Sequence, residues 1–585
     1  MASLTMYMNG QEVRTTEGST VLEAAKAAGV EIPTLCHHPA LSEWGGCRMC
    51  LVEVEPRGLL HPACTYPVSP GLRVQTHSPK VVRARKWVLQ WLFSERSHYC
   101  MYCTASGECE LQAQAYEHEL ESWMWSRPNA WMPVDASRQY FVMDHNRCIL
   151  CRRCIRACDE MPAVHTLGTG QRGAKTMVVA DLNIPFGESS CISCGSCLQA
   201  CPTGALIDRR SAYMGRDELL EATASTCMGC SVGCGIIGRT RSGRLLRIEG
   251  DGEVPVNKGL LCRLGRFAPL YVTAPRVTTP MRRVDGRLQP CSWEEALALI
   301  AERIAAAEAN EGVAVLVSSR ATTEELGAAL TLSGSQAVGL YGGAAVIEAP
   351  GPTCGLADVE RTGAVVTIEA DLDDEHEVVA CLARRAFDNG ARLYLLGGKT
   401  DRLAAWTEVM AGVSQAKEVA CELADIADVI VLYGPGATAE SLAVFAGMAN
   451  VRYLGLPAGV NTVAAAARGI GRLPEDDCGL LYVYAADDPA ATAPAVQAEF
   501  VVAHACYCSP LTDAADVVLP ALHWSEKEGH LTDLEGKERE VQRLVPAPAM
   551  LRDDKEVFAA LTERQAQRRG QVQRRGQAPP LLRRM

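Results

Sequence analysis

The feature that most constrains this chain is a row of five cysteine-rich groups that ends at Cys262. Together the groups hold nineteen cysteines and one histidine, and only seven of the 26 cysteines lie outside them. Closely spaced thiols followed by a returning ligand are a pattern with which proteins hold iron–sulfur clusters. The groups are Cys36/Cys47/Cys50/Cys64, His98/Cys100/Cys103/Cys109, Cys148/Cys151/Cys154/Cys158, Cys191/Cys194/Cys197/Cys201 and Cys227/Cys230/Cys234/Cys262. A chain with so many one-electron carriers in series is expected to conduct electrons.

The 585 residues, 48% of them hydrophobic, are enough for several domains. No stretch reaches the ~20 apolar residues that a membrane helix needs, and the first ten residues lack the features of a signal sequence. We therefore expect a cytoplasmic chain without membrane insertion, in which the cysteines bind metal rather than form disulfides. The net charge of −12 argues against nucleic-acid binding, which needs a basic face.

The N-terminus predicts a β-grasp fold. A strand at 4–8, a turn at Asn9-Gly10 and a second strand precede a helix over Thr20–Ala28, with Glu23 in capping-box register. The first cysteine group follows, with gaps of ten, two and thirteen residues, and suits a [2Fe–2S] cluster. Gly45-Gly46 would let backbone N–H groups approach the sulfurs. A tetrahedral zinc site is the alternative, although the ten-residue gap is unlike a zinc ribbon.

The second group has the spacing His-x-Cys-x2-Cys-x5-Cys and makes His98 a candidate ligand. An imidazole in place of one thiolate leaves a cluster less negative, which tends to raise its potential. The alternative is a surface histidine, with the fourth ligand supplied from elsewhere.

The third and fourth groups each have the spacing C-x2-C-x2-C-x3-C, and a proline follows the fourth. In bacterial two-cluster ferredoxins the last cysteine of each run serves the other cluster. The predicted [4Fe–4S] sets are therefore Cys148/Cys151/Cys154/Cys201 and Cys191/Cys194/Cys197/Cys158.

The fifth group, C-x2-C-x3-C with Cys262 another 28 residues on, predicts one more [4Fe–4S] site, with zinc as the alternative. In total we expect one [2Fe–2S] and four [4Fe–4S] clusters.

With these residues in view, the chain resembles the G-type (75-kDa) subunit family of NADH–quinone oxidoreductase over roughly residues 1–545. Matching stretches are GSTVLEAAKAAGVEIPTLC, GGCRMCLVEVE, SGECELQ, RCILCRRC, ADVVLPA and the EKEG…EG segment at 526–536. Two departures refine the resemblance. The usual G-type chain has its histidine where this chain has Arg96, and one complete cluster set where this chain has two. The His98-x-Cys100 form instead resembles the diaphorase small subunit of NAD-reducing hydrogenases and some NAD-linked formate dehydrogenases. Both departures favour a soluble hydrogenase- or formate-dehydrogenase-type assembly.

After residue 276 the pattern alternates between strands and helices, with strands expected at 313–318, 364–368, 391–396 and 429–433 and a helix at about 374–387. This open α/β domain resembles the molybdopterin-oxidoreductase fold. The acidic residues of 369–377 are expected to be a solvated surface run. The residues His504, Cys506, Cys508, His523 and His530 show no ligand spacing, and we interpret them as core or interface residues.

The resemblance would allow a bis-pterin molybdenum or tungsten site, which we do not expect here. The lysine of active relatives is replaced by Leu264, with Arg263 and Arg266 nearby, and Cys354 is followed by glycine rather than histidine. The 323 residues after Cys262 are also several hundred too few for the complete pterin-binding shell. We therefore expect a degenerate scaffold.

The expected architecture is a multidomain α+β and α/β chain. Its domains are a [2Fe–2S] ferredoxin type (1–78), a His(Cys)3 [4Fe–4S] domain (79–125), a two-[4Fe–4S] ferredoxin type (138–215), a [4Fe–4S] Mo/W-bis-MGD type (220–276), a molybdopterin-oxidoreductase-like domain (277–548) and a basic, disordered tail (549–585). An arm that docks on an acidic partner is the alternative for the tail.

The predicted function is an iron–sulfur electron-transfer subunit of a multisubunit NAD(P)-linked oxidoreductase, foremost a soluble hydrogenase, in one variant electron-bifurcating. No G-x-G-x-x-G fingerprint is present, so FMN and NAD(P) should bind a partner. The resemblance implies a flavin- and NAD(P)-binding subunit, a small thioredoxin-like [2Fe–2S] subunit, a terminal catalytic subunit such as a NiFe hydrogenase and, with bifurcation, ferredoxin. The alternatives are the G-type subunit of a respiratory complex and a Mo/W formate dehydrogenase.

Overall fold

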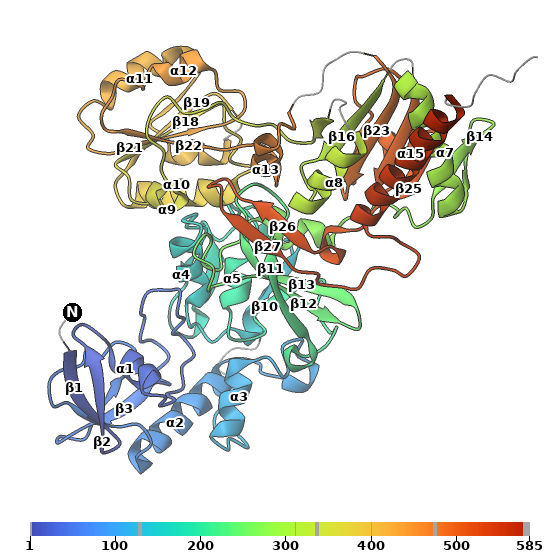
Figure 1. Cartoon of the computed structure of the whole chain (residues 1–585). Coiled ribbons are helices and arrows are strands. Elements are labelled where there is room, and N and C mark those ends of the chain that lie inside the picture. Colours follow the sequence, from blue (N-terminus) through green and yellow to red (C-terminus); the bar gives the residue numbers. More distant parts are fainter. Residues whose placement is uncertain are drawn as a thin grey trace, which may run out of the picture. The chain divides into compact units, whose positions relative to one another are not determined.

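The computed structural model describes residues 3–126, 131–309, 312–333, 338–398, 401–471 and 477–576. Figure 1 labels the helices and strands and colours the chain along its sequence. The chain divides into two compact units. The first comprises Met1–Glu221 and Lys258–Arg266, and the second comprises Ala222–Asn257 and Phe267–Met585. All 26 cysteines are free thiols. Within the described ranges, no helix is both long enough and apolar enough to cross a membrane.

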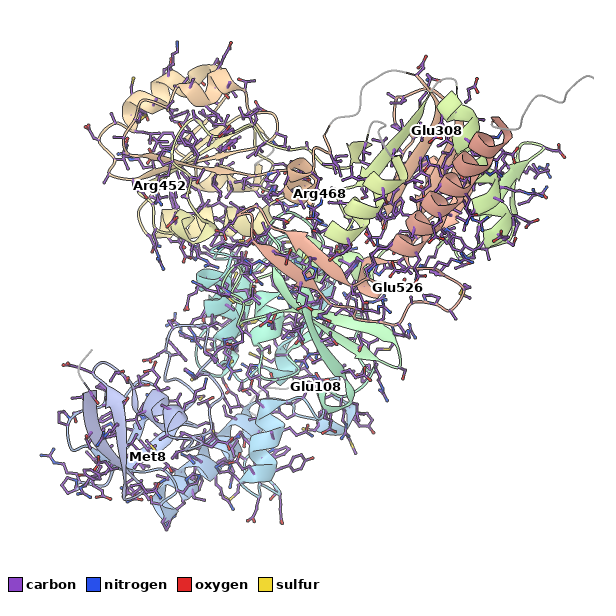
Figure 2. The ribbon with its side chains drawn as sticks, viewed as in Figure 1. Met8, Glu108, Glu308, Arg452, Arg468 and Glu526 are labelled. Atoms are coloured by element: carbon purple, nitrogen blue, oxygen red, sulfur yellow. The ribbon has the colours of Figure 1, made fainter. Side chains whose placement is uncertain are left out.

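The N-terminal domain is the predicted β-grasp, a five-stranded sheet in the order β2-β1-β5-β3-β4. Asn9 and Gly10, at φ values of 52° and 82°, make the tight turn between the first two strands. Helix α1 (Val21–Ala27) begins at the predicted capping box of Thr20 and Glu23. Its apolar face packs in the core that contains the buried Met8 (Figure 2). The strands are β1 (Ser3–Met8), β2 (Gln11–Thr16), β3 (Leu51–Val54), β4 (Leu59–Pro62) and β5 (Arg73–Gln75).

Helices flank the second cysteine group and contain parts of the third and fourth groups. Helix α2 (Pro79–Glu95) leads into the second group, and α3 (Glu110–Glu117) begins directly after it. The third and fourth groups run into α4 (Arg153–Glu160) and α5 (Ser196–Ala200), which pack against each other. The other elements of this unit include η1 (Cys100–Tyr102), β6 (Val134–Asp135), β7 (Phe141–Asp144), β8 (Leu167–Gly170), β9 (Met177–Ala180), β10 (Leu206–Asp208) and α6 (Arg263–Arg266).

The second unit begins with a three-stranded sheet and continues with two larger ones. The small sheet contains β11 (Glu221–Thr226), β12 (Gly235–Arg241) and β13 (Arg244–Gly250). The seven-stranded sheet has the order β15-β14-β25-β24-β23-β16-β17, in which the last five strands are parallel. The strands are β14 (Met281–Val284), β15 (Arg287–Pro290), β16 (Val313–Ser318), β17 (Val338–Tyr341), β23 (Cys478–Ala486), β24 (Ala498–Ala505) and β25 (Val517–Pro520). The helices α7 (Trp293–Ala309), α8 (Thr323–Ser333), α14 (Pro510–Ala514) and α15 (Asp554–Gly576) accompany this sheet.

The other large sheet is fully parallel, in the order β20-β19-β18-β21-β22. This is the open α/β arrangement predicted from the alternating pattern, with the strand order of a doubly wound sheet, and β16, β18 and β21 have the predicted bounds. The strands are β18 (Ala364–Ile368), β19 (Arg392–Leu396), β20 (Val409–Ala411), β21 (Val429–Tyr433) and β22 (Val451–Gly455), and the helices are α9 (Leu356–Val359), α10 (Glu377–Asp388), α11 (Ala416–Glu422), α12 (Ala439–Ala443) and α13 (Thr462–Ala467). A hairpin of β26 (Gly529–Thr532) and β27 (Glu538–Val541) completes the unit.

The prediction that the acids of 369–377 form a solvated surface run is wrong at Asp373 and Glu377, although Asp374 is exposed as predicted. Glu377 is 3% exposed and pairs with Arg402 at 3.3 Å, while Asp373 accepts the backbone N–H of Arg402 at 2.8 Å. These acids are buried because α10 starts among them and packs beside β18 and β19, with the arginine supplying the compensating charge.

The prediction of a disordered tail from residue 549 is also wrong over the first part of that segment. Helix α15 packs against α7 and α8, and Val557, Phe558 and Leu561 are fully buried. These three residues recur at helical spacing and supply the apolar stripe that a disordered tail would lack. A basic residue of α15 contacts the same domain as well, since Arg564 pairs with Glu294 of α7 at 2.7 Å. Residues 577–585 lie outside the described residues.

A buried charge cluster anchors the start of α15. The ammonium of Lys527 lies 3.0 Å from Asp554 and 3.3 Å from Glu325, and all three side chains are at most 3% exposed. His504 Nε2 lies 3.2 Å from Asp554, and Tyr484 donates its hydroxyl to the same carboxylate at 2.7 Å. Burial alone would raise the pKa of Asp554, but Lys527 and then His504 hold that pKa well below its usual range.

Asp554→Ala should therefore lower the opening free energy of α15 by about 3–5 kcal/mol, because Lys527 would remain buried without one of its counter-charges. Hydrogen exchange of the α15 amides would measure this change. The exposed Glu556→Ala in the same turn should stay within about 0.5 kcal/mol. Since the folded-state pKa of Asp554 is depressed, its contribution should be present above about pH 4 and fade as the pH falls. Equal effects of the two variants would contradict the anchoring role.

Candidate metal centres

The first cysteine group is assembled by the hairpin of β3 and β4. Cys50 precedes β3 and Cys64 follows β4, so the antiparallel pairing brings their sulfurs to 3.4 Å. Cys36 is 1% exposed and accepts the N–H of Cys47 at 3.5 Å. Contacts from the Cys47 and Cys64 side chains and from the Cys47 and Gly46 backbone hold the pKa of Cys36 well below its usual range. Side-chain contacts thus link the four thiols to one another, and backbone N–H groups are directed at the Cys36 sulfur.

The second group lines one pocket. His98, Cys100, Cys103 and Cys109 all face this pocket, in a mostly apolar wall. Burial lowers the pKa of His98 to about 4, so its imidazole is neutral at neutral pH. The Nε2 atom lies 3.2 Å from the carbonyl of Leu92, which can only accept, and therefore carries the ring proton. That arrangement leaves Nδ1 free to bind a metal.

Two residues of this pocket were not found from the sequence. Gly204 packs so closely that a Cβ there would lie 2.7 Å from the Cys103 sulfur. The guanidinium of Arg147 also interacts with the Cys103 thiol, and it pairs with Asp144 at 2.9 Å. Both residues are far from the second group in the sequence, and no spacing rule links them to it.

An aromatic layer covers the histidine side of the pocket. Phe93 meets the His98 ring edge-on at 5.2 Å and stacks on Trp123 at 5.4 Å. Trp87, Trp91 and Trp125 form a cluster of their own, with centroids 5.4–6.4 Å apart. The Phe93 ring lies against the histidine and shields it from water, which agrees with the lowered pKa of His98.

The third and fourth groups share one backbone design. Leu150 and Arg152 have positive φ in the third group, and Ser193 and Gly195 have positive φ at the matching positions of the fourth. The N–H groups of Leu150 and Ser193 therefore reach the first sulfur of each run, both at 3.4 Å. The duplicated geometry supplies the same N–H···S contact twice.

The last cysteine of the third group lies near the fourth group, and the last cysteine of the fourth group lies near the third. Cys201 interacts electrostatically with Cys148, Cys151 and Cys154, whose pKa values are raised first by burial and also by such neighbouring thiols. Cys158 likewise interacts with Cys191 and Cys194. The packing of α4 on α5 produces this exchange, as expected from the C-x2-C-x2-C-x3-C spacing.

The fifth group is divided between the two units. Cys227, at the end of β11, donates its backbone N–H to the carbonyl of Cys234, just before β12, at 2.8 Å, and Cys230 lies on the turn between them. Cys262 belongs to the segment assigned to the first unit. Its place in this set remains a prediction from spacing.

The residues present fit metal ligation chemically. Burial raises the pKa of Cys109, Cys158 and Cys230 to about 12 each, so these thiols would stay protonated on their own. A bound metal supplies the positive charge that makes buried thiolates stable. Among the described residues, no three histidine, cysteine or acidic side chains converge closely enough to hold a single ion. The assignment therefore rests on the grouping of buried thiols.

The segment considered for a pterin metal contains Cys354 in a cavity of about 530 Å³, lined also by Tyr433, Tyr453 and Lys537. Burial raises the pKa of Cys354 to about 12. Arg266, near the position of the lysine in active relatives, donates instead to the Cys194 carbonyl at 2.7 Å.

Four of the residues that showed no ligand spacing are either buried or in contact with neighbouring side chains. His504 and Cys506 are fully buried, as predicted. His523 contacts Ser525, and His530 pairs with Glu324 at 2.6 Å. Near them lies Glu526 (Figure 2), which forms a bidentate pair with Arg276.

Family models match the chain in five consecutive segments. They are the 2Fe-2S iron–sulfur cluster binding domain (1–79), the NADH-ubiquinone oxidoreductase-G iron–sulfur binding region (85–122), the ferredoxin-like domain of NADH-quinone oxidoreductase subunit 3 (139–207), the molybdopterin oxidoreductase Fe4S4 domain (220–274) and molybdopterin oxidoreductase (276–564). NADH-quinone oxidoreductase subunit 3 of Thermus thermophilus is 28% identical over 92% of this chain and 80% of its own length. The chain is a homologue of the G-type subunits of NADH–quinone oxidoreductase.

Other homologues match over shorter segments. A G-type subunit of NADH-quinone oxidoreductase from Rhizobium meliloti is 35% identical over 54% of this chain, and NADPH-Fe(3+) oxidoreductase subunit alpha of Geobacter sulfurreducens is 32% identical over 56%. The chain spans only 37% and 38% of these two relatives. A solved chain of NAD+-reducing [NiFe]-hydrogenase is 34% identical and covers 37% of this chain and 92% of its own, with a TM-score of 0.35.

Replacing His98 by alanine should remove or alter one cluster signal in the EPR spectrum of the reduced, iron-loaded chain, because His98 faces the pocket with Cys100, Cys103 and Cys109. His118→Ala is the matched control, since His118 is also buried but does not line the pocket. A spectrum unchanged by His98→Ala would place the fourth ligand elsewhere.

Proposed function

We propose that the chain is the iron–sulfur electron-transfer subunit of a multisubunit NAD(P)-linked oxidoreductase. The observation that carries this proposal is the series of buried thiol groups in a homologue of the G-type subunits. Clusters accept and pass single electrons, and the protein tunes their potentials through burial, hydrogen bonds and nearby charge.

The proposed ligand sets comprise one [2Fe–2S] and four [4Fe–4S] sites. They are Cys36/Cys47/Cys50/Cys64; His98/Cys100/Cys103/Cys109; Cys148/Cys151/Cys154/Cys201; Cys191/Cys194/Cys197/Cys158; and Cys227/Cys230/Cys234/Cys262. The pocket shared by the second set and the exchange of Cys158 and Cys201 support these assignments. The proposal also places the chain in the cytoplasm, in a complex with a flavin- and NAD(P)-binding subunit and a thioredoxin-like [2Fe–2S] subunit.

Within this role, a soluble hydrogenase-type complex is favoured over a respiratory one. The G-type histidine position is occupied by Arg96, which is buried and donates to the carbonyl of Thr176 at 2.5 Å. His98 lines the pocket in its place. The respiratory assignment is the second candidate, and the identity with the Thermus subunit favours it. Co-purifying subunits distinguish the two, since a nickel–iron catalytic pair would support the first and membrane subunits the second.

Metal analysis of the anaerobically purified chain should find about 18 irons with matching sulfide, from one [2Fe–2S] and four [4Fe–4S] sites. Neither molybdenum nor tungsten should be present, because the metal-binding Cys-His pair of active relatives is not found at Cys354. Stoichiometric molybdenum or tungsten would contradict the electron-relay proposal and indicate that the molybdopterin-like domain is catalytic.

The isolated, cluster-loaded chain should lack NADH–dye reductase activity, because hydride transfer would require the flavin of its partner. Adding the flavin subunit should restore activity. Substantial turnover without flavin would contradict the relay.

A further inference from the structure

Helix α4 holds the loop of the [2Fe–2S] group as well as two cysteines of the ferredoxin-type pair. Arg156 donates one N–H group to the carbonyl of Cys36 and another to that of Ser42. Glu160, one turn later, accepts the N–H and the hydroxyl of Ser42 at 2.6 and 2.5 Å. Arg152, one turn earlier, lies over the Trp44 ring at 4.4 Å. Arg156 and Glu160, one turn apart on α4, and Arg152 just before the helix therefore hold the loop that carries Cys36.

Among the described residues, Arg156 is a buried cation without a carboxylate partner. Its residue is 8% exposed, and its guanidinium donates to two neutral backbone carbonyls. The nearby carboxylate of Glu160 is directed to Ser42 instead. An uncompensated buried charge is costly, so this guanidinium requires a nearby negative charge.

A cluster with four thiolate ligands would supply that charge. The Arg156 guanidinium sits on the carbonyl of Cys36, a proposed ligand, and reduction adds one further negative charge to such a cluster. Cys154 and Cys158 lie two positions away on α4 and so project from other sides of the helix. The charge of Arg156 is therefore directed at the [2Fe–2S] site.

We propose that Arg156 is a positioning residue that raises the reduction potential of the [2Fe–2S] site by placing a buried positive charge on its Cys36 loop. This inference rests on the proposed function, because it requires the cluster on Cys36, Cys47, Cys50 and Cys64. No proton or bond changes in the step, which is the gain of one electron by the cluster, so the effect is electrostatic.

The test is EPR-monitored potentiometry of the full, iron-loaded chain with two variants of Arg156. Arg156→Gln should lower the [2Fe–2S] midpoint potential by at least about 59 mV, equal to a tenfold change in the ratio of reduced to oxidised cluster. Arg156→Lys retains the charge and should stay close to the wild type. Arg152→Gln removes a second positive charge, from the residue just before α4, and it should lower the potential less than Arg156→Gln because Arg152 contacts the Trp44 ring rather than the Cys36 carbonyl.

The outcome depends on whether the [2Fe–2S] midpoint potential differs between the Arg156→Lys and Arg156→Gln variants. A potential that is low, or a cluster that is lost, only in Arg156→Gln supports the electrostatic role. Lysine and glutamine variants that behave alike, whether both match the wild type or both lose the cluster, overturn it. A wild-type chain without a [2Fe–2S] signal would instead refute the proposed function.

Discussion

The arginine-rich helix α4 is the constraint on which the arrangement of the first unit depends. Arg153 is 4% exposed and forms a bidentate pair with Glu110, the residue after Cys109. Arg156 reaches the Cys36 loop, and Cys154 lies on the same helix. Buried guanidiniums thus tie two cysteine groups to the short helix that carries part of the third, and they tolerate little displacement because an unpaired buried charge is costly.

The buried thiols of the first unit indicate that its folding is linked to metal binding. The raised pKa values of Cys109 and Cys158 mean that these thiols stay neutral until a cation replaces their protons. The N–H groups at Leu150 and Ser193 already approach the sulfurs, and both depend on left-handed backbone that the surrounding fold maintains. Cluster binding and folding of this unit are therefore expected to stabilise each other.

The second unit contrasts with the first in where its charges lie. Its two doubly wound sheets are held by apolar cores and by the Lys527–Asp554–Glu325 cluster, which connects α15 to the domain. Cys354 lies there in a cavity, where burial raises the pKa of its thiol. The division agrees with a relay in which one unit holds most of the carriers and the other serves as a scaffold.

The sequence alone determined the cysteine groups, the β-grasp beginning and the strands β16, β18 and β21, because spacing and hydrophobic periodicity are local properties. It did not reveal Gly204 beside Cys103, Arg156 on the Cys36 carbonyl or the buried start of α15 at Asp554. These contacts join residues about 30 to 230 positions apart, and a basic tail is expected to be solvated until its few apolar residues find a surface. Only the tertiary structure decided which charges are buried, because burial depends on what packs against a side chain and not on its neighbours in the chain.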